Sequence, residues 1–490
     1  MSSTVMTSEA IKTRLERDSI GERQVPANAY YGIQALRGSE NFPMTGFKPA
    51  QVYPEAIRAF GWIKKAAAQT NRDLNLLDPL DNANNNAIGN ALMQAADEMI
   101  AGRFDDQFIV DVFQGGTGTS NHMNANEILA NRATEILGGK LGDYRVNPND
   151  HANYGQSTND VTPTVMRLTV LAKHPALMAS IRMLEQALRD KSNEFSQILI
   201  PGRTHMQDAV PLTLGQVFGG YANAIKHAGD NVAYFRERLL MIGLGASALG
   251  TGLNTHAEYR PRVTAALAEF SGFPLRQHED YFQATSSFGC FADYSSALRS
   301  VAIELEKIAH DLKLYSSGPK TAIAEIKLPS LQPGSSIMPG KVNPVLVELM
   351  DQVSYAVQGN DMTIALCAQN GQWQLNVMMP LTLIRLVESM TLLTNGLREF
   401  STRCVSGLEA NLENIETRMS RSTILLTALN PYIGYAQAAA VAKKVLSEGC
   451  TVREAVLALA LKEHTGALIT PERLDAMLSV EAMTAPPKIM

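Results

Sequence analysis

Long apolar runs are missing from this sequence of 490 residues, and so are long runs of like charge. No stretch of about 18 or more apolar residues occurs, and residues 1–19 carry no apolar segment of the kind found in export signals. We therefore expect neither membrane insertion nor export, and we expect a cytoplasmic location. The formal charge of −5, from 43 basic and 48 acidic residues, gives no reason to expect nucleic acid or an anionic membrane as a partner.

Cysteine is scarce as well. The four cysteines lie far apart, with no Cys-x-x-Cys pair and no histidine at zinc-finger spacing. They are expected to be reduced thiols that pack as small apolar groups: Cys290, Cys367, Cys404 and Cys450. No cluster of metal ligands is visible, which leaves activation by a divalent metal open. Residues 243–252 contain G-x-G but not the full dinucleotide fingerprint, which indicates a close-packed turn.

Helical periodicity dominates the middle of the chain. Between residues 293 and 318, apolar residues recur at intervals of three and four, at Leu298, Val301, Leu305, Ile308 and Leu312. This spacing predicts a long amphipathic helix that stops at Gly318 and Pro319. The pattern repeats at Leu177, Ile181, Leu184 and Leu188, and residues 212–242 and 345–400 are rich in apolar residues without strand alternation. The sequence therefore predicts a mainly α protein built on a long-helix bundle.

Three domains are expected from the length and from the change of pattern along the chain. Residues 1–160 predict an N-terminal mixed, mostly helical domain, with Asn-, Gly- and Pro-rich connections that include 82–86 and 147–150. Residues 161–410 predict the bundle, in which Gly219, Gly220, Ala222 and Ala224 permit close helix approach and self-association. Residues 411–490 predict a small C-terminal helical domain, with helices at 452–462 and 471–478.

The segment GSSIMPGKVNP, residues 334–344, predicts a shaped polar loop. Gly334 and Gly340 free the backbone, whereas two prolines fix φ and remove N–H groups. The loop is not a phosphate-binding P-loop, because five residues separate its glycines and Val342 follows Lys341. Its candidate binding groups are two hydroxyls, one ammonium and one amide, on Ser335, Ser336, Lys341 and Asn343.

Three further loops share this polar composition. Residues 115–126 place Thr119 and Ser120 among glycines, residues 156–160 group Ser157, Thr158 and Asn159, and residues 202–208 hold Thr204 and His205. Neutral donors with one lysine can hold carboxylates through charge-assisted hydrogen bonds, without an excess of buried positive charge. The combination indicates a small dicarboxylate.

Each loop also has a purely structural interpretation. The first can be a surface turn, residues 117–120 can be turn formers, and residues 157–160 can cap the helix that follows. A lone histidine such as His205 is more often a hydrogen-bonded structural residue than a catalyst. Taken singly, none of these loops decides between the interpretations.

Taken together and in this order, the loops resemble those of the aspartase/fumarase superfamily. The signature loop of that family is similar to residues 334–344 without a gap. Its G-x-G-T segment resembles residues 117–120, its S-[ST]-N-D segment residues 157–160, and its G-R-T-H segment residues 202–205. The resemblance runs from about residue 21 to about residue 485.

The resemblance implies a fold and an assembly. Family members are homotetramers in which five long helices from each subunit form a central 20-helix core, and each active site collects loops from three subunits. They catalyse reversible anti elimination of ammonia, water or another amine from a succinyl group, giving fumarate. They use no organic cofactor, so no cofactor is expected here.

The resemblance also implies roles for individual residues. Ser335 is the base that removes the Cβ proton, and loop N–H groups with Lys341 stabilise its alkoxide. Removal of that proton leaves an aci-carboxylate dianion. Hydrogen bonds to this dianion come from Thr119, Ser157, Thr158 and Ser336.

The remaining site residues face the other end of the substrate. By the same resemblance, Lys341 and Asn343 bind the second carboxylate, and Ser120 joins the substrate-binding set. The leaving group is faced by Asn159, Thr204 and His205. Glu348 orients His205, since a carboxylate fixes the tautomer of an imidazole and favours its protonated form.

Within the family, the sequence most resembles aspartate ammonia-lyase. That resemblance lies in residues 29–37, in QSTND at 156–160 and in GQWQLNVM at 371–378, whereas residues 130–139 and 253–259 look closer to class II fumarases. We therefore predict aspartate deamination. The alternatives are a class II fumarase, a lyase of an N-substituted aspartate, and a non-catalytic structural relative.

Departures from the family pattern bear on the substrate. The family usually has Asn at the position of His122, a Lys or Met and a small residue at Tyr154 and Gly155, and a charged residue at Met379. Altered loops can mean an altered substrate, which is why the substituted aspartate stays among the alternatives.

Overall fold

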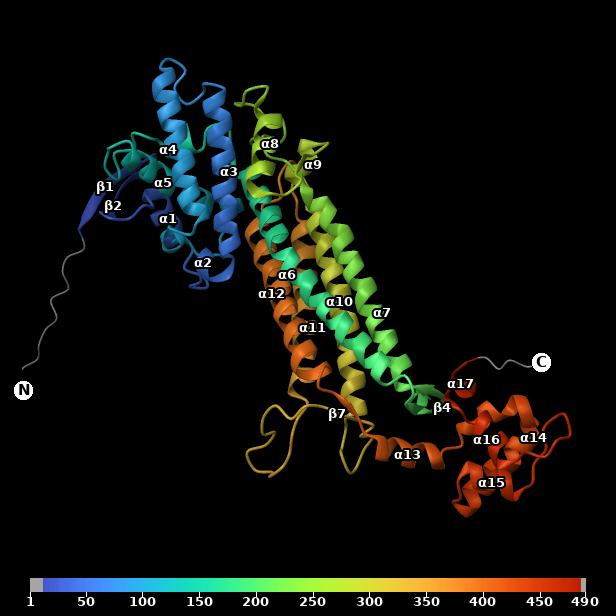
Figure 1. The fold of residues 1–490 in the computed structure, drawn as a ribbon. Helices are drawn as coiled ribbons and strands as arrows, with labels where there is room; N and C mark the ends of the chain where they lie inside the picture. The colour runs from blue at the N-terminus through green and yellow to red at the C-terminus, as the bar shows by residue number, and fades with distance from the viewer. Residues whose placement is uncertain (1–11, 486–490) are drawn as a thin grey trace, which may run out of the picture. The chain divides into compact units, whose positions relative to one another are not determined.

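The computed structural model describes residues 12–485, and their fold is mainly helical, as predicted (Figure 1). Five long helices occupy the predicted bundle segment: α6 (Thr158–Glu194), α7 (Leu214–Arg236), α10 (Gly289–Tyr315), α11 (Val345–Gln369) and α12 (Met379–Phe400). The strands are short and pair in two-stranded sheets. Within the described residues, none of the helices combines the length and the apolar character that a membrane span requires.

The chain divides into two compact units, and each unit contains part of every long helix. Unit 1 comprises residues 1–177, 231–299 and 356–392. Unit 2 comprises residues 178–230, 300–355 and 393–490. The three-domain organisation stays a prediction.

Unit 1 is built around α3 (Pro54–Asp73), which packs against α4 (Asn82–Ile100) and α8 (Tyr259–Ser271). Helix α5 (Thr119–Ile136) packs in turn against α4 and against α1 (Ile33–Asn41). The unit also contains α2 (Pro49–Val52), α9 (Tyr281–Ser286), the antiparallel hairpin of β1 (Thr13–Asp18) and β2 (Gly21–Pro26), and the parallel pair of β5 (Met241–Ile242) and β6 (Arg276–Gln277).

Helix α5 holds the N-terminus of α1 in place. The buried Glu127 carboxylate on α5 accepts hydrogen bonds from the N–H groups of Gly32, Gln34 and Ala35 at distances of 2.7 to 3.0 Å. These are N–H groups that a helix start leaves without internal partners. Burial raises the pKa of Glu127 to about 7, and the three N–H groups oppose that rise.

The asparagine run at residues 82–86 was expected to be a connection, and that prediction is wrong because the run forms the first turns of α4. Asp81 caps the helix by accepting hydrogen bonds from the N–H groups of Ala83 and Asn84. Asn85 is buried, and its amide accepts from the Leu77 N–H and donates to the Arg72 carbonyl. A buried amide with both ends paired is compatible with a helix interior.

The predicted helical seams are confirmed. All five periodic apolar residues of α10 and all four of α6 are buried. Close approach of α6 and α7 is also confirmed within unit 2, where a Cβ on Gly229 would lie 2.7 Å from Ile181 and one on Gly219 would lie 3.0 Å from Ser192. Gly220 faces open space instead.

Hydrogen bonds join neighbouring bundle helices within each unit. In unit 1, Ser295 of α10 donates to Asp361 of α11 at 2.7 Å. In unit 2, Tyr221 of α7 donates to Asp311 of α10 at 2.5 Å. These two bonds pair polar groups across helix interfaces.

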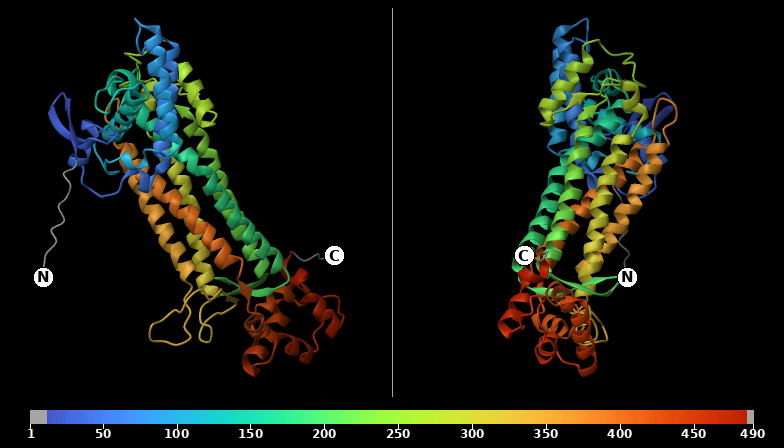
Figure 2. Two further views of the ribbon diagram at one scale, coloured as in Figure 1. Left: turned by 60° about the vertical axis from the view of Figure 1, so that its left-hand side comes forward. Right: turned by 90° about the vertical axis from the view of Figure 1, so that its right-hand side faces the viewer.

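The C-terminal part of unit 2 has its own apolar core. Helices α14 (Leu425–Glu448), α15 (Val452–Ala458) and α16 (Pro471–Met477) gather around it (Figure 2), and α17 (Val480–Thr484) follows. The helix predicted at 452–462 ends earlier, because Ala460 takes a φ of +45° and the chain turns back to pair Lys462 with Leu468.

Five further short elements belong to unit 2. Strands β3 (Leu199–Thr204) and β4 (Gln207–Thr213) form an antiparallel hairpin, on which α13 (Leu412–Arg421) packs. Strands β7 (Ile326–Lys327) and β8 (Glu409–Ala410) pair antiparallel.

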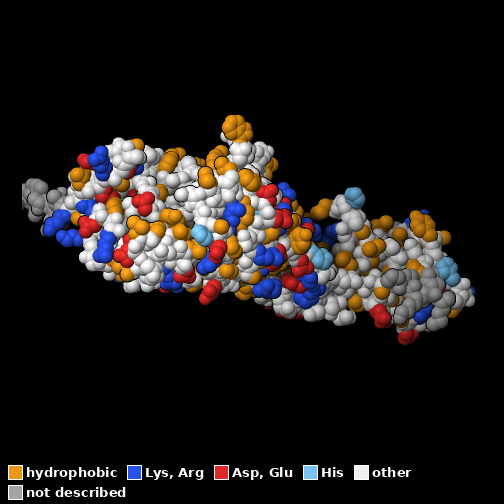
Figure 3. Space-filling model, turned by 90° about the horizontal axis from the view of Figure 1, so that it is seen from above, with side chains coloured by type: hydrophobic (Ala, Val, Ile, Leu, Met, Phe, Trp, Pro, Cys, Tyr) orange, Lys and Arg blue, Asp and Glu red, His pale blue; other side chains and the backbone are white. Residues whose placement is uncertain are grey.

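Surface charge and cysteines agree with the sequence. Basic and acidic side chains are interspersed on the face shown in Figure 3. The four cysteines are free, with Cys367 and Cys404 buried. Burial raises the pKa of the Cys404 thiol to about 12, so this thiol is protonated at neutral pH and behaves as a small apolar group.

Candidate active site

The first candidate loop delivers the start of α5. Gly116, Thr117 and Gly118 take φ values of 68°, 64° and 87°, a left-handed turn that is strained for Thr117. The turn places Thr119 as the first residue of α5, where its hydroxyl donates to the Gly116 carbonyl at 2.7 Å. Thr119 is exposed, and the positive end of a helix dipole favours an anion.

The second candidate loop delivers the start of α6. The Ser157 N–H donates to the Asp160 carboxylate at 3.0 Å, and the Asn159 N–H donates to the Ser157 hydroxyl at 3.2 Å. These contacts cap the helix. The side chains of Ser157, Thr158 and Asn159 are half-buried, and the Asn159 amide donates to the Ala248 carbonyl at 2.7 Å. The capping and binding interpretations are therefore compatible.

The structure brings these two helix starts together within unit 1. The Thr158 hydroxyl oxygen lies 2.9 Å from Nδ1 of His122, in the first turn of α5. A Cβ on Gly118 would lie 3.3 Å from Thr162 in the first turns of α6. The two helix N-termini thus lie close together, an arrangement suited to an anionic group.

Asp160 connects the start of α6 to residues 243–252. Its buried carboxylate also accepts the N–H groups of Gly245 and Ser247, at 3.0 and 2.9 Å. Burial raises the pKa of Asp160 to about 7, while these N–H groups and the nearby Lys64 oppose the rise. Residues 243–252 thus form the close-packed turn that was predicted. The anchoring role of Asp160 was not predicted.

A buried lysine and histidine support Thr158. Nζ of Lys64, on α3, lies 2.7 Å from Nε2 of His122 and 2.8 Å from the Gln156 side-chain oxygen. Burial lowers the pKa of Lys64 well below its usual range, opposed by Asp160. Burial and the Lys64 charge likewise hold the pKa of His122 well below its usual range, so His122 is neutral. Sequence reasoning missed Lys64 altogether.

Ser120 faces α1 and not the start of α6. A Cβ on Gly38 of α1 would come within 2.7 Å of the Ser120 Cβ, so Ser120 packs against α1. It lines a cavity of about 520 Å³ together with Arg37 and Tyr144. Its role in substrate binding stays a prediction.

The signature loop in unit 2 is closed at its base. The Gly334 N–H donates to the Lys341 carbonyl at 2.7 Å, and the Asn343 amide donates to the Gly334 carbonyl at 2.8 Å. A Cβ on Gly334 would lie 2.8 Å from the Asn343 nitrogen and from the Lys341 oxygen. Glycine is therefore required at this position.

The loop aims backbone donors at Ser335. Its hydroxyl oxygen accepts the N–H groups of Ile337 and Met338 at 3.2 and 2.9 Å, which favours negative charge on that oxygen. Ser335 is half-buried, whereas Ser336 and Lys341 are exposed. Among the residues that the structure describes, none forms a hydrogen bond or ion pair with the Lys341 ammonium.

The third candidate loop is the turn of the β3–β4 hairpin. His205 and Met206 take φ values of 54° and 61°, and Thr204 pairs with Gln207, which makes a two-residue hairpin turn. Thr204 and His205 are exposed, as is Glu348 in the first turn of α11. Within the described part of one chain, no ion pair joins His205 to Glu348. Their pairing stays a prediction.

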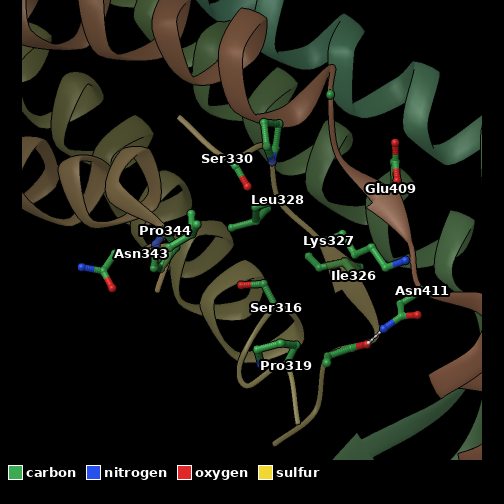
Figure 4. Close-up of a pocket in the computed structure, with 14 residues that line it drawn as sticks. Ser316, Pro319, Ile326, Lys327, Leu328, Ser330, Asn343, Pro344, Glu409 and Asn411 are labelled. Carbon is green, nitrogen blue, oxygen red and sulfur yellow. Dashed lines mark hydrogen bonds between the residues drawn. The ribbon is translucent and has the colours of Figure 1, made fainter. Parts of the chain in front are cut away.

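A cavity of about 530 Å³ lies behind the loop base (Figure 4). It is lined by Asn343 and Pro344 together with residues around β7 and β8, where the Asn411 amide donates to the Ala324 carbonyl at 2.8 Å. The Asn343 amide points away from this cavity in Figure 4. Ser335, Ser336 and Lys341 do not line it, so it is not the predicted substrate site.

The predicted site residues thus form two groups. Unit 1 carries Thr119, Ser120, Ser157, Thr158 and Asn159. Unit 2 carries Thr204, His205, Ser335, Ser336, Lys341, Asn343 and Glu348. Helix starts and hydroxyls characterise the first group. A serine with two backbone donors, next to a lysine, characterises the second.

Sequence comparison identifies the class as lyases. The family described as "Lyase" matches residues 21–359, and the family described as "Fumarase C C-terminus" matches residues 425–485. The chain therefore belongs to the lyase family that contains the aspartases and class II fumarases.

Relatives of both activities are equally similar. Aspartate ammonia-lyase of Bacillus subtilis is 43% identical over 474 residues, which are 96% of this chain and 96% of that protein. Class II fumarate hydratase of Thermosynechococcus vestitus is also 43% identical, over 96% of this chain and 98% of that protein. A cobalt-bound fumarate lyase:delta crystallin from Brucella melitensis has a TM-score of 0.89 and 41% identity, and covers 95% of this chain and 98% of that chain.

Proposed function

We propose that the protein is an aspartate ammonia-lyase, which eliminates ammonia reversibly from L-aspartate to give fumarate. The observation that carries the proposal is the pair of backbone N–H groups on the Ser335 oxygen, in a loop that also presents Lys341. This arrangement supplies what a serine base needs, because a serine alkoxide is stable only beside donors or positive charge.

Ser335 removes a proton from Cβ of the substrate. The C–H electron pair then moves toward the neighbouring carboxylate and gives the aci-carboxylate dianion. Four hydroxyls hold this dianion: Thr119, Ser157, Thr158 and Ser336. The helix starts of α5 and α6 contribute two of these hydroxyls, Thr119 and Thr158, and the positive ends of the two helix dipoles. Donors that tighten on the dianion lower the barrier.

Collapse of the dianion then breaks the bond between Cα and nitrogen and releases ammonia. Lys341 and Asn343 bind the second carboxylate, with Ser120 completing the binding set. Asn159, Thr204 and His205 surround the amine, and Glu348 orients His205. Elimination is anti, so the base and the amine lie on opposite faces of the substrate.

Assembly completes the site. The active form is a homotetramer in which the long helices make a 20-helix core and three subunits supply the loops of each site. The exposed positions of Lys341, His205 and Glu348 support this proposal, since groups that bind a dianion gain strength when another subunit excludes water from them. The cytoplasmic location belongs to the same proposal.

Class II fumarase is the second candidate. Its support is the equal identity to a curated fumarase and the fumarase-like segments at 130–139 and 253–259. A lyase of an N-substituted aspartate is the third, supported by the departures at Tyr154, Gly155 and Met379.

The test is fumarate absorbance with the purified protein, with L-aspartate and L-malate in parallel wells. Product from aspartate alone is the expected result. Product from malate alone replaces the ammonia-lyase by a fumarase. Silence in both wells excludes both and directs the assay to substituted aspartates.

A further inference from the structure

Three groups in unit 1 form a chain from the buried α3 to the start of α6. Lys64 contacts His122, and His122 contacts the Thr158 hydroxyl, at 2.7 and 2.9 Å. Lys64 is 3% exposed and His122 is 1% exposed. The Phe60 ring stacks on the imidazole, with centroids 6.1 Å apart and planes inclined by 9°. The orientation of the imidazole is therefore fixed on both edges and on one face.

In its charged form, Lys64 is the donor in its contact with His122. The other groups around its nitrogen are oxygen acceptors, from Gln156 at 2.8 Å and Asn153 at 3.2 Å, with the Ala152 carbonyl farther away at 3.5 Å. The orientation of the Gln156 amide is set, because its nitrogen donates to the carbonyls of Ala152 and Tyr154. An ammonium has three hydrogens for the Gln156 and Asn153 oxygens and for Nε2 of His122. The buried Asp160 carboxylate favours the charged form of Lys64, against the effect of burial.

The tautomer of His122 follows from this contact. With Lys64 charged, Nε2 accepts one of its hydrogens, so the single hydrogen of the neutral ring lies on Nδ1. Nδ1 therefore donates to the Thr158 oxygen. That contact occupies a lone pair of the Thr158 oxygen. The hydrogen of the Thr158 hydroxyl therefore remains available for another acceptor.

We propose that His122 is a positioning residue that turns the Thr158 hydroxyl hydrogen toward the substrate carboxylate. The proposal rests on the proposed function, in which Thr158 holds the aci-carboxylate. His122 itself does not touch the substrate, because it is buried behind Thr158. The departure from the usual Asn of the family thus keeps the donor, since the amide nitrogen of an asparagine occupies nearly the place of Nδ1.

A matched pair of substitutions tests the direction of the hydrogen bond. His122→Asn keeps a donor toward Thr158, whereas His122→Asp has nearly the same shape but only accepts. The aspartate would accept the Thr158 hydrogen and turn it away from the substrate. We expect H122D to lower kcat/KM for the active substrate by about ten- to a hundredfold relative to H122N.

The Thr158→Val background separates orientation from other effects. A valine has no hydroxyl to orient, so H122N and H122D should then agree within about twofold, an additivity failure typical of coupled residues. A ratio that stays large in T158V shows that the charge of the aspartate acts directly, and it overturns the proposal. Equal kcat/KM for H122N and H122D in the wild-type background overturns it as well.

Failure of the proposed function has a different signature. If T158V alone leaves kcat/KM unchanged, Thr158 is not in the substrate site, and the site assignment falls together with this proposal. If T158V lowers kcat/KM but the H122N and H122D variants agree, only the role of His122 is wrong.

His174 provides the folding control. It is also a buried histidine in unit 1, its Nδ1 lies 2.9 Å from the Tyr294 hydroxyl, and it lies 16 positions after Thr158 on α6, about 24 Å along the helix. H174N and H174D measure how the same substitutions affect stability and activity at a site far from Thr158. We expect the kcat/KM values of these two variants to agree. Melting temperatures of all variants identify any that fail to fold, and the H122N to H122D ratio is then taken at a temperature where both are folded.

Discussion

Ser335 is a residue whose environment fixes its chemistry. Replacing Ser335 by Ala removes the oxygen on which two backbone N–H groups converge. We expect kcat to fall by about 10²- to 10⁴-fold, the usual contribution of a general base, with little change in melting temperature. Fumarate absorbance measures the first quantity and circular dichroism the second.

Ser479 is the matched control for this change. It is an exposed serine whose hydroxyl also accepts a backbone N–H, from Ala482 at 3.3 Å. S479A should turn over at the wild-type rate. Near-normal turnover of S335A would remove Ser335 from the role of base.

Asp18 carries a pH-dependent share of stability. Arg37 holds its carboxylate through two hydrogen bonds of 2.7 and 3.0 Å, and this contact lowers the pKa of Asp18 below its ordinary value of 3.8. A carboxyl whose pKa is lower in the folded state stabilises the fold above its ordinary pKa, and that contribution is lost as the pH falls through the folded-state pKa.

Asp18→Asn should therefore cost about 1–2 kcal/mol at pH 7 and progressively less below about pH 4. Urea unfolding of the wild type and of D18N across this range measures the difference. A difference that does not change with pH would assign the effect to packing and not to the charge of Asp18.

Single functional residues could be predicted from the sequence where they lie in a recognisable motif. Residues that are special only because they are buried could not. Ser335, Thr158 and Lys341 stand in recognisable polar loops. Lys64 does not, yet it occupies the seam of α3, where Ile57, Phe60, Lys64, Ala67 and Asn71 recur at intervals of three and four and are all buried. A lysine in an apolar seam is a signal of a buried polar network, but its partners come from segments distant in sequence, and spacing alone does not identify them.

Among the structural elements, the signature loop depends on close contact at its base. A Cβ at Gly334 meets backbone atoms of Asn343 and Lys341 at 2.8 Å, which the backbone can relieve only by moving. We expect Gly334→Ala to lower kcat/KM by at least about tenfold through displacement of Ser335, a site that tolerates little misplacement. The melting temperature should change by only a few degrees, because the loop is largely exposed.

Gly340 is the contrasting position in the same loop. Nothing lies within 4 Å of a Cβ at Gly340, although its φ is +79°. G340A therefore introduces backbone strain without a steric clash. We expect the decrease in kcat/KM to be smaller for G340A than for G334A. The reverse order would mean that the left-handed turn, and not the closed base, positions Ser335.

Elements with strong periodicity were predicted well, and breaks were not. The seams of α6 and α10 follow from spacing because burial of one face requires it. Residues 345–400 gave no sign that α11 and α12 are separate, since the break at 370–378 depends on distant contacts. There Gly371 approaches the Ser286 carbonyl, and the Asn376 amide donates to the Cys367 carbonyl at 2.9 Å.

The whole molecule exposes apolar side chains on a bundle helix. Met362 and Leu366 lie one turn apart on α11 and are 63% and 53% exposed. The proposed tetramer would cover this face. We expect M362D/L366D to elute as a smaller species than the wild type in size-exclusion chromatography with light scattering, with loss of activity, because buried charges oppose assembly and each site needs several subunits.

Leu446 supplies the control, since it is 78% exposed on α14. L446D should keep the size and activity of the wild type. A double variant at Met362 and Leu366 that keeps the wild-type size would place the subunit interface elsewhere.

Fold class and family could be read from the sequence at this scale, because helix periodicity and four ordered loops extend along most of the chain. The sequence does not predict which of the loops lie close together in the fold. Spacing places Thr119 and Ser157 on separate segments, and only packing shows that the starts of α5 and α6 converge. Under the proposed assembly, pairing of His205 with Glu348 would depend on neighbouring copies, which one sequence does not position.

The hydrogen bond that closes the signature loop restricts how Asn343 can evolve. Its amide nitrogen has two hydrogens, and the Gly334 carbonyl already takes one to close the loop. Only the other remains for a substrate carboxylate. Under the proposed function, this single side chain serves both loop shape and ligand recognition. A substitution of Asn343 would therefore change both properties, and we expect new specificity to arise at neighbouring positions that serve only one of them.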